Sequence, residues 1–148
     1  MIAPARIAMI GSSAMVVAVL ATNVIVRIAG PASRPFSFSE SIASAVPEAL
    51  GVGFFAWVGM YFGARLAPPN QRNGQLVKLV AIAHGVFGTL LTLPIKTHAV
   101  MVDMPSASDA SAIQMMPLLI PVALIAGVVL GSLFITRVLA ALSEPRIA

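Results

Sequence analysis

Long stretches without a charged residue constrain this chain more than any motif. Residues 8–26 and residues 110–136 contain no Asp, Glu, Lys or Arg, and two further stretches in the middle of the chain come close to this. An α-helix needs ~20 apolar residues to cross a bilayer, and lipid admits only a backbone that satisfies its own hydrogen bonds. The sequence therefore predicts an all-α integral membrane bundle of four transmembrane helices.

The composition supports the same fold class. Charged residues make up 9% of the chain, the hydrophobic fraction is 59%, and the mean hydropathy is +0.98, whereas soluble domains carry roughly a quarter charged residues. The net charge of +4 comes from nine Lys/Arg against five Asp/Glu. These charges are too few and too scattered for a nucleic-acid interface, so no nucleic-acid partner is expected. The high hydropathy predicts the lipid bilayer as the first partner.

We expect a single domain over residues 1–148, with helices at about residues 7–28, 47–66, 76–95 and 117–142. The first apolar run is longer than the 7–15 residues of a signal-peptide core, so we expect it to be retained as a spanning helix. Two prolines are expected at helix starts: Pro47 would begin the second helix, and the fourth would begin at Pro117 or bend near Pro121.

The basic residues predict an orientation. If the four helices cross in turn, one side of the membrane carries six basic residues and the other side carries three. The positive-inside rule then places both termini in the cytoplasm of a bacterial cell, with the chain in the cytoplasmic (inner) membrane. The six are Arg6, Arg65, Arg72, Lys78, Arg137 and Arg146, and the three are Arg27, Arg34 and Lys96.

Four of the five acids fall on the side opposite the termini. They are Glu40, Glu48, Asp103 and Asp109. Two interpretations stay open: an ordinary solvated loop surface, or a docking face for a partner or a cation. Because Arg27 and Glu48 flank the same connection, we expect a structural ion pair between them, with Glu48 at the membrane interface.

Small residues recur four positions apart in every predicted helix. This spacing places them on one helix face, where backbones can approach closely. Two uses stay open, packing inside the bundle and contact with another subunit. The principal positions are Ala14 and Ala18, Gly59 and Gly63, Gly85, and Gly127 and Gly131. Asn23, the most polar side chain of the first helix, is expected to form an interhelical hydrogen bond.

The chain has two histidines, His84 and His98. On one unbroken helix they would lie within about 40° of each other and about 21 Å apart. This is the spacing at which cytochrome-b-like helices hold two haems, although such a site needs further histidines or a methionine from a partner helix. Haem binding at His84 and His98 is therefore one hypothesis, and a core His84 with a surface His98 is the other.

Catalysis has no sequence support. The chain contains no cysteine, no nucleotide-binding glycine loop, no zinc-binding cluster and no credible Ser-His-Asp set. A proton- or cation-coupled transporter would place an acid at membrane depth, and none of the five acids is expected there. We therefore predict a non-enzymatic protein with no catalytic residues, no metal site and no required cofactor.

The layout resembles that of small uncharacterised four-helix bacterial integral membrane proteins. The resemblance is carried by a first helix that ends in residues 23–30, a Phe36-Ser37-Phe38 loop and a Gly-rich second helix. It implies the fold and no activity. The leading functional hypothesis is an accessory or structural subunit of a larger membrane complex, the alternative is a small homo-oligomeric transporter or channel, and a haem-binding protein is the third.

Overall fold

The computed structural model describes residues 1–29, 38–102 and 110–143, without the side chains of residues 27, 29, 94–102 and 110–118. Its elements, in order, are α1 (Pro4–Ala29), α2 (Phe38–Leu66), the short 3-10 helix η1 (Pro69–Gln71), α3 (Gly74–Val102) and α4 (Ala110–Leu142). Within the described residues, four helices are long and apolar enough to cross a membrane. The predicted all-α fold is confirmed at this level.

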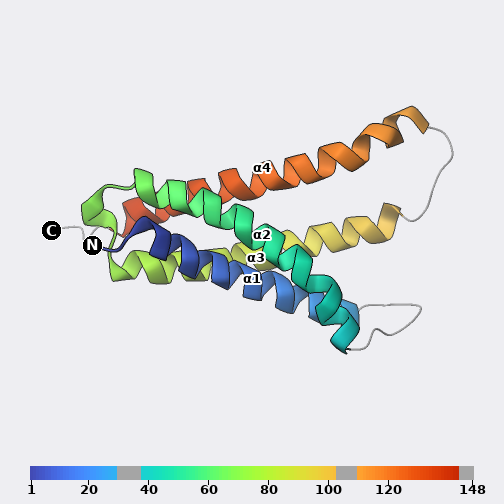
Figure 1. Cartoon of the computed structure of the whole chain (residues 1–148), viewed down its shortest axis with the longest axis horizontal. Coiled ribbons are helices and arrows are strands. Elements are labelled where there is room, and N and C mark those ends of the chain that lie inside the picture. The colour runs from blue at the N-terminus through green and yellow to red at the C-terminus, as the bar shows by residue number, and fades with distance from the viewer. Residues whose placement is uncertain (30–37, 103–109, 144–148) are drawn as a thin grey trace.

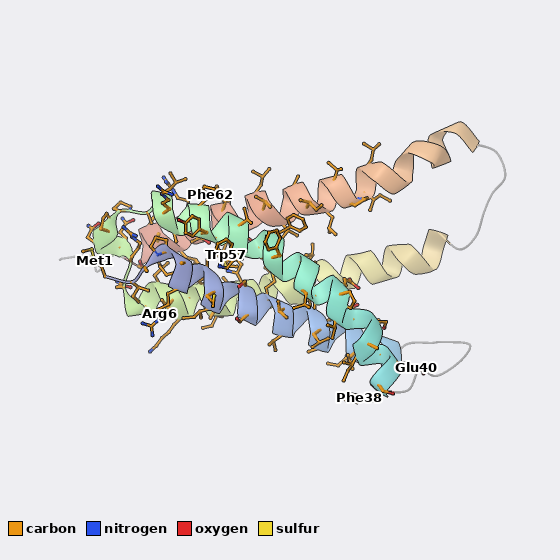
Figure 2. The ribbon with its side chains drawn as sticks, viewed as in Figure 1. Met1, Arg6, Phe38, Glu40, Trp57 and Phe62 are labelled. Carbon is orange, nitrogen blue, oxygen red and sulfur yellow. The ribbon has the colours of Figure 1, made fainter. Side chains whose placement is uncertain are left out.

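The helices run alternately in opposite directions (Figure 1). α1 packs along both α2 and α3, α2 packs along α4, and α3 has far fewer contacts with α4. This arrangement is consistent with the predicted bundle. Figure 2 places Met1 and Arg6 at one end of it and Phe38 and Glu40 at the other. We call these the terminal end and the loop end.

The interior of the bundle is apolar with a few polar side chains. On α1 the buried positions recur every four residues, at Ile7, Gly11, Met15, Val19 and Asn23, so they lie on one face of the helix. The outer surface carries large apolar side chains, as Phe54 and Phe134 show with 61% and 67% exposure. Such a surface is unfavourable in water and well matched to lipid tails.

Hydroxyl groups on the helices are mostly satisfied locally. Thr22, Thr92 and Thr136 each donate a hydrogen bond to the carbonyl oxygen four residues earlier, at 2.7, 3.0 and 2.7 Å. A hydroxyl bonded in this way needs no partner on another helix. These side chains can therefore occupy an apolar environment at little cost.

All four helices extend beyond their predicted bounds, and α2 differs most. It begins at Phe38, so Pro47 lies inside it, and α4 begins at Ala110, ahead of both Pro117 and Pro121. The expected helix starts at Pro47 and Pro117 are wrong. The physical reason is that a proline inside a helix removes a single backbone donor, and membrane helices tolerate this where the surrounding turns continue the helix.

Hydrogen bonds tie the terminal end together. The backbone N–H of Ile2 donates to the carbonyl of Arg72 at 3.1 Å. The Asn73 side chain accepts a hydrogen bond from the N–H of Leu76 at 3.0 Å, which caps α3, and donates to the carbonyl of Ser143 at 3.3 Å. The Ser143 hydroxyl donates to the carbonyl of Gln71 at 3.1 Å. The chain start, the α2–α3 connection and the end of α4 are thereby joined.

Candidate functional site

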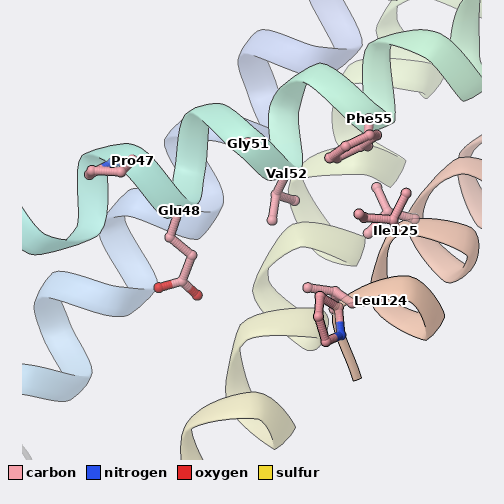
Figure 3. Close-up of a pocket in the computed structure, with 9 residues that line it drawn as sticks. Pro47, Glu48, Gly51, Val52, Phe55, Leu124 and Ile125 are labelled. Carbon is pink, nitrogen blue, oxygen red and sulfur yellow. The ribbon is translucent and has the colours of Figure 1, made fainter. Parts of the chain in front are cut away.

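An open apolar groove of about 230 Å³ lies between α2 and α4, toward the loop end. α2 and α4 run in the same direction and separate there, so side chains from both helices form the walls (Figure 3). The groove carries one charged group, the carboxylate of Glu48. Its lining residues are Pro47, Glu48, Gly51, Val52 and Phe55 from α2 and Pro121, Leu124, Ile125 and Val128 from α4.

Glu48 lies further inside its helix than the sequence suggested. Its expected place at a helix start is wrong, because α2 begins ten residues earlier, at Phe38, and its place at the membrane interface stays a prediction. A Cβ added at Gly53 would meet the side chain of Val16, so these two residues lie at one level. Glu48 is five residues, or about 7.5 Å, nearer the loop end than Gly53. This depth falls within the candidate membrane span of α1, Pro4–Val26.

The position of Glu48 inside α2 bears on the question of transport. The candidate span of α2, Phe38–Leu66, contains both Glu40 and Glu48 and is longer than the ~20 residues that cross a bilayer, so the absence of an acid at membrane depth stays a prediction. The half-buried carboxylate borders a groove with otherwise apolar walls. An acid at membrane depth is costly and usually serves a function.

Asn23 is fully buried, as expected, but it does not form the expected interhelical hydrogen bond. Neither its side-chain oxygen nor its side-chain nitrogen has a partner among the described residues. Thr92 on α3 is also buried, but its hydroxyl donates to the carbonyl oxygen of Gly88 on the same helix and not to Asn23. An unpaired buried amide costs about 1–3 kcal/mol, so Asn23 lowers the stability of this packing.

His84 belongs to the interior of the bundle. Its Nδ1 lies 2.8 Å from the carbonyl oxygen of Val80, so Nδ1–H donates, and in the neutral ring Nε2 then carries a lone pair. Nε2 is buried and has no partner among the described residues. The side chain of His98 lies outside the described part of the chain, and His84 does not line the groove. Haem binding by these two residues stays a prediction.

Three of the predicted packing glycines lie close to a neighbouring helix. A Cβ added at Gly59 would meet the carbonyl oxygen of Val129, and one added at Gly63 would come within 2.8 Å of the Thr136 Cβ. Both glycines therefore allow α2 and α4 to approach closely. At Gly131 an added Cβ would lie 3.2 Å from the ring of Phe87 on α3.

Other predicted packing positions have more space. An added Cβ at Gly85 or Gly127 would find no neighbouring atom within 4 Å. Ala14 and Ala18 are half-buried, and Ala18 lies beside Gly88 of α3, where an added Cβ would come within 3.2 Å of it. The small residues at Gly85 and Gly127 thus leave helix surface that the described part of the chain does not cover.

Three predicted charged positions cannot be placed. Asp103, Asp109 and the side chain of Arg27 lie outside the described residues, so the expected pair between Arg27 and Glu48 stays a prediction. Groups of three or more His, Cys, Asp or Glu that could hold a metal ion are absent from the described part of the chain. The groove itself was not predicted, because most of its walls are ordinary apolar side chains.

Comparison with known proteins adds no relative. No protein-family model, no curated protein and no solved structure matches the chain. The resemblance in layout to small four-helix bacterial membrane proteins therefore stays a prediction.

Proposed function

We propose that this chain is an integral protein of a bacterial cytoplasmic membrane, with both termini in the cytoplasm, and a non-catalytic subunit of a larger membrane complex. The apolar outer surface supports insertion into lipid. The orientation is supported by the basic residues of the terminal end, since positively charged loops and helix ends favour the cytoplasmic side.

The observation that carries the subunit proposal is the exposed first half of α4. Leu119, Ile120 and Val122 are 62%, 60% and 63% exposed, and Gly127 has open space where a Cβ would lie. Apolar side chains therefore surround this part of α4 on several sides. A helix surface with bulky residues around an open glycine can accept a second helix at short distance.

The groove between α2 and α4 extends the same surface. A partner helix beside Gly127 would reach the edge of this groove at Leu124, which lies about 60° from Gly127 around α4, whereas Ile125 lies on nearly the opposite face. A partner that filled the groove would bring its own apolar side chains into contact with the groove walls. A stable association of this kind buries more than ~1,000 Å² in total.

Recovery of the partner tests this proposal. The tagged chain is extracted from its native membrane in a mild detergent, and co-migrating polypeptides are identified by mass spectrometry. We expect stoichiometric recovery of a different membrane polypeptide. Recovery of the chain alone, as a homodimer that exchanges or conducts a solute in liposomes, would overturn the subunit proposal.

A small homo-oligomeric transporter or channel is the second candidate, and Glu48 favours it. A carboxylate at membrane depth beside an open groove is a feature of proteins that couple transport to protons or cations. In that case Glu48→Gln should abolish solute exchange in liposomes while leaving the extracted chain folded. Under the subunit proposal, the same variant has no such activity to lose.

A further inference from the structure

Five basic side chains surround the terminal end of the bundle. Arg6 lies near the start of α1, Arg65 near the end of α2, Lys78 near the start of α3 and Arg137 near the end of α4, and Arg72 lies in the α2–α3 connection. Figure 2 shows Arg6 at this end and Glu40 at the opposite end. We call these five residues the basic collar.

The basic collar is not neutralised by the described part of the chain. Its members have no acidic partner there, and the one polar contact of an Arg137 guanidinium nitrogen is with the carbonyl oxygen of Leu66, at 3.1 Å. Four of the five side chains are exposed, and Arg72 is half-buried with an unpaired Nε. The described acids, Glu40 and Glu48, both lie toward the other end.

We propose that the basic collar binds the phosphate groups of anionic phospholipids. Each of the four helices carries one of these cations within five residues, or about 7.5 Å, of its terminal end. This spread matches a layer of lipid headgroups better than a single compact ligand. Arginine and lysine both donate hydrogen bonds to phosphate oxygens, and each basic residue near an anionic membrane surface strengthens the attraction. This proposal rests on the proposed membrane insertion and is independent of the partner subunit.

The single tryptophan of the chain gives a direct test. Trp57 lies about 12 Å from Arg65 along α2 and is half-buried, and bromine atoms on lipid acyl chains quench tryptophan fluorescence at short range. The purified chain is reconstituted into mixed vesicles of phosphatidylglycerol and phosphatidylcholine, with either the anionic or the zwitterionic lipid brominated. We expect about fivefold stronger association of the anionic lipid at low salt, and a smaller preference at 1 M salt.

Matched variants test which basic residues cause the preference for anionic lipid. Arg6→Gln combined with Arg65→Gln should remove most of it, because both side chains are exposed and available to headgroups. The control combines Arg27→Gln with Lys96→Gln, which removes the same charge from residues toward the loop end. It should leave the preference at the terminal end unchanged.

The possible failures are distinguishable. Equal quenching by the two brominated lipids would overturn lipid binding by the basic collar while leaving membrane insertion intact. An anionic preference of unchanged size in Arg6→Gln/Arg65→Gln would also overturn it. Quenching by neither lipid would overturn both the proposal and the insertion on which it rests.

Discussion

Gly59→Ala should lower the free energy of unfolding by about 1–3 kcal/mol, the typical cost of forcing an extra carbon into a packed interface. The added Cβ would meet the backbone carbonyl of Val129 on α4 and come within 3.0 Å of the Ser132 Cβ. A backbone group cannot rotate away as a side chain can, so the two helices must separate. Thermal unfolding of the purified protein in detergent measures the change.

Gly51→Ala is the matched control on the same helix. Gly51 has no neighbouring atom within 4 Å of an added Cβ, and alanine stabilises a helix interior by roughly 0.5–1 kcal/mol relative to glycine. This variant should therefore be as stable as the parent chain or slightly more so. Equal stability of Gly59→Ala and Gly51→Ala would contradict the close contact of α2 with α4.

Gly127→Leu should eliminate most of the recovered partner subunit while leaving the fold of the chain intact. The reason is that open space surrounds Gly127 within the chain, so a bulky side chain there obstructs only a helix that approaches from outside. The measurement is the amount of partner that co-purifies in mild detergent, together with the thermal stability of the extracted variant.

Gly85→Leu makes the same chemical change at an open position on α3. It should leave partner recovery unchanged, because the exposed part of α4 carries the proposed interface. If Gly85→Leu abolished recovery and Gly127→Leu did not, the partner would contact α3, and the proposed role of α4 would be wrong.

The membrane-spanning helices were predictable because their signal is averaged over many residues. A charge-free run such as residues 8–26 outweighs the propensity of any single residue in it. Helix starts were less predictable, because Pro47 is compatible with the first turn of a helix and also with its interior. Only the packing of the preceding turns decides between the two positions.

The candidate site was less predictable than the fold. Glu48 was recognised as a charge near a helix, but its depth depends on where α2 begins, and that start was predicted wrongly. The groove forms where α4 separates from α2, and its walls, such as Phe55 and Leu124, are the same residue types that face lipid elsewhere. The sequence likewise did not distinguish the closely packed Gly59 from the open Gly127.

Cysteine accessibility tests the central claim, that the helices cross a membrane with the terminal end in the cytoplasm. The natural chain contains no cysteine, so single substitutions carry no background. An impermeant thiol reagent added to spheroplasts should label Ser39→Cys at the loop end and Ser108→Cys in the α3–α4 connection. It should label Gln75→Cys at the terminal end only after the membrane is opened. Labelling of Gln75→Cys alone in intact spheroplasts would contradict the orientation, and labelling of all three would contradict the crossing itself.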